Sequence, residues 1–285
     1  MKKILIIAND SKDPNHEWTK VVKEYIEKRG GQAVVASKAA DGSGEDIIPT
    51  NEGVECALVL GGDGTMLRAA RDIGEAGIPM LGINLGTMGF LADVEKERFA
   101  DAIDRILEDD FIIQDRMLVS GVIDKADGER IELKPALNDI TITRQGSLHV
   151  IHVEVYVNGQ YLCKLGADGV IASTPTGSTG YNLSAGGPII NPTANLIVMT
   201  PICAHTMNAR SIVVGPDETI EFVIGSNRHG DEILAEASSD GSETFVIKTG
   251  DKVTVTRAPH NIKLLRLNTK SFVQVLNRKM GTLEM

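Results

Sequence analysis

Residues 58–67 read LVLGGDGTML, an apolar run that passes into a glycine-rich turn and then into helical spacing. The apolar run does not alternate, as in a parallel strand that is covered on both faces. Similar strand candidates lie at 2–8, 33–36 and 79–83, and helical spacing of apolar residues occurs at 18–26, 65–73 and 99–107. Strands that alternate with helices predict a doubly wound, Rossmann-like α/β domain with a parallel sheet over residues 1–115.

After residue 115 the pattern changes to short alternating strands that follow one another closely, the last two of them at 253–256 and 262–266. Asn158-Gly159, between two such strands, is a strong signal for a tight hairpin. These features predict an all-β sandwich domain over residues 116–266. Helical spacing returns at 272–280, and we expect the tail, 267–285, to pack back on the first domain.

Composition and charge argue against several classes of protein. The chain has 285 residues, and 29 Lys and Arg against 39 Asp and Glu give a formal net charge of −10. A nucleic-acid partner is not expected, since binding to a phosphate backbone needs a basic patch. No apolar run approaches the roughly 18 residues of a membrane span, and the apolar start after MKK is too short for a secretion signal.

The three cysteines, Cys56, Cys163 and Cys203, lie in apolar runs without CxxC pairing. This predicts buried, reduced thiols and a cytoplasmic protein.

Many of the 29 glycines gather in two stretches, and the first contains Gly61, Gly62 and Gly64. Bare backbone there lets N–H groups converge on an anion, and the start of the following helix adds more. The loop is neither a Walker A sequence nor GxGxxG. A carboxylate in such a cradle repels phosphate unless it ligates a metal or accepts a proton, so Asp63 indicates chemistry. The alternative is a turn in which Asp63 only caps the helix.

Arg68 follows one turn into the predicted helix. Its guanidinium could close over a polyphosphate, and an exposed helical arginine is the equally simple alternative. Gly86 and Gly89 follow the next predicted strand along the chain. Because the carboxyl ends of neighbouring parallel strands meet at one edge of a sheet, we expect the two glycine loops to form one crevice.

The second glycine stretch is uncharged except for one aspartate. Residues 166–188 read GADGVIASTPTGSTGYNLSAGGP, and such hydroxyl donors suit a neutral hydrogen-bonding ligand such as a nucleoside. A serine-hydrolase elbow at Ser178 is disfavoured, because Thr176 replaces the first glycine of GxSxG. A long Gly/Ser/Thr loop without a function is the other alternative. Asn138-Asp139 can bind a ribose, with the carboxylate accepting hydrogen bonds from its hydroxyls, or can be an ordinary turn before a strand.

Taken together, GGDGT at 61–65, Asn138-Asp139 and above all STPTGSTGYNLSAGGP at 173–188 closely resemble the NAD kinases, and PICAHTMNARSIVV at 201–214 is a looser match. GGDGT alone is shared with lipid and sphingoid kinases and, loosely, with phosphofructokinases. Residues 173–188 are therefore the stretch that distinguishes the NAD kinases from these other families. The chain departs from the family pattern at Asp139, where Glu is more frequent, and at Ala204 and Ser211, which replace prolines.

The resemblance implies transfer of the γ-phosphoryl group of ATP to the 2′-hydroxyl of the adenosine ribose of NAD, giving NADP, with Mg²⁺ held mainly by the donor phosphates. It implies that Asp63 is the general base and that Gly61, Gly62, Gly64 and Arg68 contact the donor. The NAD-binding residues that it implies are Asp63, Gly64, Asn138, Asp139, His149, Asp168, Thr176, Thr179, Gly180, Tyr181, Asn182 and Ser184. Asp168 is expected on the nicotinamide side, in a pocket shared across a subunit boundary. For His149, a ligand contact and an exposed strand histidine are equally open.

Two other functions stay open. A lipid kinase of the same superfamily would need an apolar or basic surface facing a membrane, and the net charge of −10 disfavours it. A non-catalytic dinucleotide sensor would keep residues 173–188 and lose Asp63. Polyphosphate as an alternative donor and NADH as an alternative acceptor are also open. The family is commonly dimeric or tetrameric, so we expect a homodimer or homotetramer.

Overall fold

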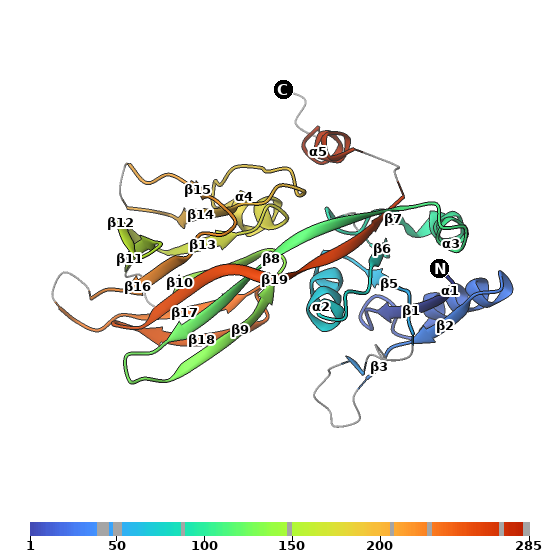
Figure 1. The fold of residues 1–285 in the computed structure, drawn as a ribbon, viewed down its shortest axis with the longest axis horizontal. Helices are drawn as coiled ribbons and strands as arrows, with labels where there is room; N and C mark the ends of the chain where they lie inside the picture. Colours follow the sequence, from blue (N-terminus) through green and yellow to red (C-terminus); the bar gives the residue numbers. More distant parts are fainter. Residues whose placement is uncertain are drawn as a thin grey trace. The chain divides into compact units, whose positions relative to one another are not determined.

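The computed structural model describes residues 1–38, 46–47, 53–86, 89–146, 150–205, 208–226, 230–267 and 271–281 (Figure 1). The chain forms two compact units, Met1–Asp115 with Ile262–Met285, and Arg116–Asn261. Two long strands, β8 (Ile112–Asp124) and β19 (Lys252–Arg266), have residues in both units.

The first unit contains a parallel sheet. Its strands β2 (Gln32–Val35), β1 (Lys3–Ala8), β5 (Cys56–Gly61) and β6 (Met80–Asn84) are neighbours in that order, and β6 also pairs in parallel with β7 (Val94–Glu95) and with β19. All six residues of β5 are buried, as expected for a strand covered on both faces. A short ladder of β3 (Ser37–Lys38) and β4 (Asp46–Ile47) follows β2.

Helices cover both faces of this sheet. Helices α1 (Glu17–Lys28) and α3 (Phe99–Leu107), the latter after a 3₁₀ turn, η1 (Lys96–Arg98), share one apolar core with β1 and β5. Helix α2 (Asp63–Ile73) packs on the other face, where a Cβ atom on Gly82 would lie 2.8 Å from Met66 Sδ. Figure 1 draws α2 on the opposite side of the sheet from α1 and α3.

The C-terminal helix α5 (Phe272–Met280) belongs to the first unit and contacts residues that follow β6. Ser271 and Gln274 form a reciprocal capping box at its start. Arg278 pairs with Glu95 at 2.8 Å, and the Lys279 ammonium lies 5.7 Å from the centre of the Phe90 ring. Polar contacts hold the helix, because none of its residues is buried.

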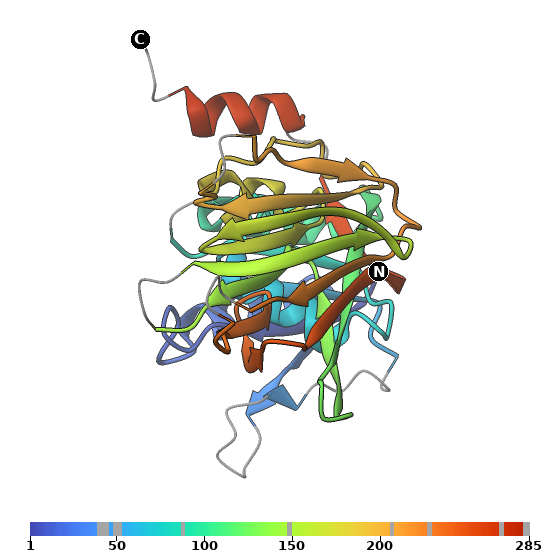
Figure 2. The same ribbon diagram turned by 90° about the vertical axis from the view of Figure 1, so that its left-hand side faces the viewer.

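The second unit is a sandwich of two sheets, and its strands run side by side in Figure 2. One sheet contains β12 (Gln160–Ala167), β11 (Ile151–Val157), β16 (Ile220–Ile224), β19, β8 and β9 (Arg130–Ala136). The other has the order β15 (Ile212–Val214), β14 (Ile197–Ile202), β13 (Gly169–Ser173), β10 (Asp139–Arg144), β17 (Leu234–Ser239) and β18 (Glu243–Lys248). Neighbouring strands are antiparallel, and apolar side chains from both sheets form one core. The predicted fold class, an α/β domain plus a β-sandwich, is confirmed.

Details within the sandwich differ from the sequence prediction. The Asn158-Gly159 hairpin is confirmed, with left-handed φ of 52° and 73°. Residues 169–173, expected to be loop, instead form the buried strand β13, because flanking Gly, Ser and Thr obscure a short apolar run. Two strands expected at 253–256 and 262–266 are one continuous strand, β19, since the polar residues between them lie where it passes from one unit to the other.

The cysteine prediction holds for only one thiol. Cys56 is buried, and burial raises the pKa of its thiol to about 12. Cys163 is half-buried and Cys203 is exposed, so an apolar neighbourhood in sequence did not ensure burial of these two. Among the helices of the described residues, none has the length and apolar character needed to span a membrane.

Candidate active site

The first glycine loop lies where β5 ends and α2 begins. A Cβ atom on Gly61 would lie 2.2 Å from Thr65 Oγ1, so the start of α2 requires a glycine here. Gly64 is exposed, and a Cβ atom on it would meet nothing within 4 Å. The N–H groups of Gly62, Asp63 and Gly64 have no acceptor among the residues that the structure describes. Three free donors at a helix start form a site suited to an anion.

The Asp63 carboxylate faces the backbone that follows Gly89. It accepts hydrogen bonds from the N–H groups of Phe90 at 2.8 Å, Leu91 at 3.1 Å and Ala92 at 3.4 Å. A Cβ atom on Gly89 would lie 1.8 Å from Asp63 Oδ1, so the glycine allows this approach. The loops after β5 and β6 therefore meet, as the sequence predicted.

Asp63 does not cap its helix. The cap position is Gly62, and no side chain caps the start of α2. A carboxylate has about four lone-pair sites, so the three backbone bonds leave roughly one for a further hydrogen. Arg68 is half-buried, and its Nη2 donates to the Ala8 carbonyl at 3.1 Å, so the guanidinium is directed toward the end of β1.

The sandwich unit contains a cavity of about 380 Å³, a size typical of small-molecule pockets. Its lining consists of Asn138, Asp139, Thr141, Thr143, Tyr181, Ser238, Asp240 and Gly241. Residues 139, 141 and 143 share one face of β10, because alternate side chains of a strand point the same way. Ile140 and Ile142 on the opposite face belong to the sandwich core. Asn138, Asp139 and Tyr181, three of the predicted NAD-binding residues, therefore line one cavity.

Asp139 is an unusual carboxylate because it is only 5% exposed. Burial, together with the charge of Asp240, raises the pKa of Asp139 to about 7. Such a group changes its charge near neutral pH, unlike an ordinary aspartate. The cavity thus contains a carboxyl group that can either accept or donate a hydrogen bond under mild conditions.

Asp240 fixes the turn that carries Asn138 and Asp139. Its carboxylate accepts from the N–H groups of Leu137 at 2.8 Å, Asn138 at 2.8 Å and Asp139 at 3.1 Å. Its own N–H donates to the Asp139 carbonyl at 3.0 Å. Sequence reasoning missed this residue, because Asp240-Gly241 after a strand is typical of an ordinary hairpin turn. Nothing in the sequence connects it with residues 137–139.

Much of the second glycine stretch is used to hold its own loop together. A Cβ atom on Gly177 would lie 2.1 Å from the Asn138 carbonyl oxygen. Asn182 is fully buried; its Nδ2 donates to the Ser178 and Pro188 carbonyls at 3.1 Å each, and its Oδ1 accepts from Thr200 at 2.6 Å. Asn182 is therefore bonded within its own unit, and its predicted role in binding NAD stays a prediction.

The remaining predicted residues of this stretch lie in different settings. Thr176 is buried, and its carbonyl accepts from the Thr179 hydroxyl at 3.3 Å. A Cβ atom on Gly180 would lie 3.5 Å from Asn138 Nδ2, so this glycine is beside the Asn138-Asp139 turn. Ser184, at the end of the short helix α4 (Tyr181–Ser184) that follows the 3₁₀ turn η2 (Gly177–Thr179), is exposed.

Asp168, another predicted residue, is not part of the lining of this cavity. Asp168 is half-buried between β12 and β13, and its carboxylate lies 3.2 Å from Arg144 Nε. An ion pair thus orients it toward β10 and leaves part of it accessible. His149 lies outside the described residues, so its role stays a prediction.

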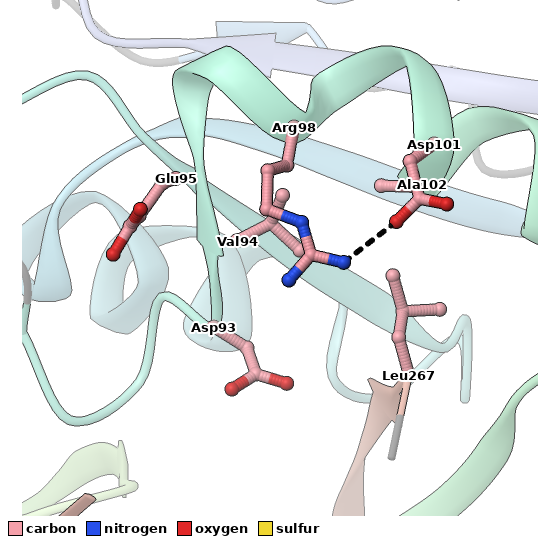
Figure 3. Close-up of a pocket in the computed structure, with 7 residues that line it drawn as sticks. All are labelled: Asp93, Val94, Glu95, Arg98, Asp101, Ala102 and Leu267. Atoms are coloured by element: carbon pink, nitrogen blue, oxygen red, sulfur yellow. Dashed lines mark hydrogen bonds and ion pairs between the residues drawn. The ribbon is translucent and has the colours of Figure 1, made fainter. Parts of the chain in front are cut away.

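A small cavity of about 20 Å³ in the first unit offers no comparable site (Figure 3). It is lined by Asp93, Val94, Glu95, Arg98, Asp101, Ala102 and Leu267. Arg98 Nη2 lies 2.9 Å from Asp101 Oδ2, and Asp93 Oδ1 lies 3.6 Å from Arg266 Nη1. Its space suits about one water molecule, so we assign no substrate to it.

Comparison with known proteins agrees with the resemblance found in the sequence. The family model of the ATP-NAD kinase N-terminal domain matches residues 4–111, and that of the ATP-NAD kinase C-terminal domain matches residues 137–267. The NAD kinases of Lachnoclostridium phytofermentans and Agathobacter rectalis are 42% and 40% identical over 284 residues, which cover 99% of this chain and 99% of each relative.

Solved structures share the fold. Yeast NADH kinase complexed with NADH has a TM-score of 0.86 at 23% identity, covering 100% of this chain and 89% of that chain. An NAD kinase from Archaeoglobus fulgidus in complex with ATP has a TM-score of 0.73 at 22% identity, covering 93% and 94%. The family models and the relatives together show that this chain belongs to the ATP-NAD kinase family of phosphotransferases.

Proposed function

We propose that the protein transfers the γ-phosphoryl group of ATP to the 2′-hydroxyl of the adenosine ribose of NAD, giving NADP. The observation that carries this proposal is the carboxylate of Asp63 beside the three free N–H donors of residues 62–64. An anion cradle next to a proton acceptor is what phosphoryl transfer to a hydroxyl requires. The acceptor is supported by relatives named NAD kinase, and ATP by the Archaeoglobus fulgidus NAD kinase in complex with ATP.

On the donor side, we assign the phosphate contacts to backbone. The N–H groups of Gly62 and Gly64 point to no acceptor of the described chain, and Gly61 lets the loop turn tightly against Thr65. Arg68 follows in the first turns of α2, where its guanidinium lies at the end of β1 and would offset negative charge on the donor phosphates. Such fixed donors stabilise the charge that spreads over the transferring phosphoryl oxygens.

In the reaction, the oxygen of the 2′-hydroxyl forms a bond to the γ-phosphorus as the bond to the β–γ bridging oxygen breaks and ADP leaves. The hydroxyl proton passes to Asp63, which retains roughly one lone-pair site beside its three backbone bonds. The backbone bonds hold the carboxylate in one orientation, so little reorganisation is needed when the proton moves.

A divalent metal ion fits the donor side without a protein cage. Among the described residues, no group of three or more His, Cys, Asp or Glu side chains could hold a metal ion. Mg²⁺ often binds through substrate phosphates with few protein ligands, so the donor phosphates would be its main ligands here. Bound Mg²⁺ would neutralise charge on the donor phosphates.

On the acceptor side, we assign the NAD adenosine to the cavity of the sandwich. Asn138 and Asp139 would bind the ribose and adenine region, with the Asp139 carboxylate accepting from hydroxyls. Tyr181 would cover the ligand with its exposed ring. Thr179, Gly180 and Ser184 would contact the ligand directly. Thr176 and Asn182 would act by holding the loop that carries those residues. Gly64 and His149 are assigned to the NAD site from the family resemblance, and Asp168 would contact the nicotinamide end of the ligand.

We also propose a homodimer or homotetramer in the cytoplasm. The edge strands of the two sandwich sheets expose apolar side chains, with Tyr161 at 60%, Leu162 at 42% and Val213 at 51%. Exposed apolar residues on unpaired edges are suited to contact with another copy. Sedimentation of the purified protein gives the oligomeric state, and a monomer at all concentrations would contradict this part.

The assay for the proposed activity is NADP formation from NAD, ATP and Mg²⁺, read with an NADP-specific dehydrogenase. We expect product that depends on all three components. NAD binding without product would indicate a sensor, and phosphorylation of diacylglycerol vesicles without NADP would indicate a lipid kinase. Replacing ATP by polyphosphate, or NAD by NADH, then defines the donor and acceptor.

A further inference from the structure

We infer that Lys12 is a further residue of the donor site, where its ammonium group binds the phosphate chain of the donor. The inference rests on the proposed function and adds a side-chain cation to a cradle that the motif describes only as backbone. Lys12 lies outside GGDGT, in the stretch NDSKDPN at 9–15, where nothing in the sequence distinguishes it from a surface lysine.

The Lys12 side chain lies over the glycine loops. A Cβ atom on Gly62 would lie 3.0 Å from Lys12 Nζ, and one on Gly86 would lie 3.2 Å from the same nitrogen. These two glycines belong to the loops after β5 and β6. The ammonium thus occupies the space above both loops, next to the free N–H groups at the start of α2.

The backbone under Lys12 is fixed on one side by the end of β1. The Lys12 N–H donates to the Asn9 carbonyl at 2.9 Å, and the Ser11 N–H donates to Asn9 Oδ1 at 3.0 Å. Asn9 Nδ2 in turn donates to Thr65 Oγ1 of α2 at 3.0 Å. The turn is therefore attached to the helix whose start forms the cradle.

The other side of the turn is fixed by Asp13, which is 2% exposed. Its carboxylate accepts from the Trp18 N–H at 3.0 Å, the Thr19 N–H at 2.9 Å and the Thr19 hydroxyl at 2.7 Å. Burial opposes ionisation, but the hydrogen bonds from Thr19 and Trp18 prevail and lower the pKa of Asp13. Asp13 is thus committed to α1 and is not an ion-pair partner for its neighbour.

The Lys12 ammonium has no hydrogen-bond or ion-pair partner among the described residues. The Asp63 carboxylate, the acidic group of the loop, is already bonded to three backbone N–H groups. An ammonium has three donors and no acceptor, and phosphate oxygens are strong acceptors for it. Three free N–H groups and one free cation around the same two loops match the oxygens of a polyphosphate chain.

The test compares Lys12→Gln with wild type and with Lys20→Gln. Lys20 is an exposed lysine of α1, so the control removes the same charge without touching the glycine loops. Calorimetry with inorganic tripolyphosphate measures binding directly, and steady-state assays measure the KM for ATP and for NAD. Lys12→Arg tests rescue by a second cation.

We expect Lys12→Gln to weaken tripolyphosphate binding and to raise the KM for ATP by roughly tenfold, as loss of a charge-assisted hydrogen bond predicts. The KM for NAD should change less than about twofold, Lys20→Gln should resemble wild type, and Lys12→Arg should recover part of the affinity. Added salt should narrow the difference between Lys12→Gln and wild type.

Equal tripolyphosphate binding by Lys12→Gln and wild type would overturn the inference, as would a loss shared equally by Lys20→Gln. Failure of the proposed function has a different signature. A wild-type protein that forms no NADP but binds tripolyphosphate through Lys12 would refute the kinase activity and leave Lys12 as a phosphate-binding residue.

Discussion

The two glycine-rich regions of the molecule look alike in composition and differ in what the glycines do. At 61–64, bare backbone leaves N–H groups open beside an exposed Gly64 and under the Lys12 ammonium. At 177–187, glycines let the chain touch itself, with Gly177 against Asn138 and Gly187 against Asn182. A cluster of glycines can therefore mark either the approach of a ligand or the approach of another chain segment.

The polar groups follow the same division. In the first region Asp63 retains lone-pair capacity, and three backbone donors have no acceptor among the described residues. In the second, Ser178 and Asn182 are fully buried and bonded within the loop. We expect substitutions in the first region to act on catalysis, and many of those in the second to act on stability.

The largest expected effect belongs to Asp63→Asn. The amide keeps the size of the side chain but cannot take the proton of the attacking hydroxyl, so kcat should fall by roughly 10²–10⁴-fold. NAD binding, measured by calorimetry, should stay within about threefold of wild type. A kcat close to that of wild type would remove Asp63 from its role as the base.

Gly177→Ala and Gly64→Ala sharpen the contrast between the regions. A Cβ atom at 177 would lie 2.1 Å from the Asn138 carbonyl oxygen, so the free energy of unfolding should fall by about 1–3 kcal/mol. At 64 nothing lies within 4 Å, and alanine favours a helix, so stability should hold or rise slightly while the KM for ATP increases. Urea unfolding measures the stability of both variants, and steady-state assays measure the KM for ATP. Equal losses of stability in the two variants would contradict the distinction between the regions.

Asp139 should give NAD binding a pH dependence. Burial and the charge of Asp240 raise the pKa of Asp139 to about 7, and the proposed contact needs the ionised carboxylate. The KM for NAD should therefore fall roughly tenfold between about pH 6 and 8, and Asp139→Asn should abolish this dependence while raising the KM. A KM that rises with pH would show that the neutral form binds.

The same group affects stability with a known sign. A carboxyl whose pKa is raised on folding binds more protons in the folded state, so its favourable contribution is complete below about pH 4 and is lost as the pH rises to about 7. Thermal unfolding of Asp139→Asn should show a weaker decline over this window than that of wild type. An unchanged decline would mean that Asp139 is not the group responsible.

The smallest contrast compares Asn182→Ala with Ser184→Ala. Asn182 is fully buried with three hydrogen bonds, so its loss should lower the free energy of unfolding by about 2 kcal/mol. Ser184 is exposed, so its replacement should leave stability within about 0.5 kcal/mol and raise the KM for NAD about threefold. The reverse order would place Ser184 in the structure of the loop and Asn182 at the ligand.

The fold was largely predictable because the spacing of apolar residues along the sequence shows which faces of the strands and helices are buried. The unalternating run of β5 and the Asn158-Gly159 hairpin both appear as expected. Strand β13 was missed because its apolar residues are few and lie between glycine, serine and threonine. The length of β19 was missed because its polar centre resembles a loop.

The site was predictable where a motif joins neighbours in sequence, as in GGDGT. It was not predictable where distant residues meet, because pairings such as Asp240 with residues 137–139 arise only from the folded sheet. For Lys12, position rather than residue type is informative. For the hydroxyls of 173–184, composition showed the donors but not that several are already bonded inside the loop.

The most direct test of the account follows the label from γ-³²P-ATP after incubation with the protein, NAD and Mg²⁺. We predict that the label appears in a dinucleotide that an NADP-specific dehydrogenase accepts and that loses the label when its 2′-phosphate is removed. Label found only in inorganic phosphate, or in a product that such a dehydrogenase does not accept, would contradict transfer to the 2′-hydroxyl of NAD.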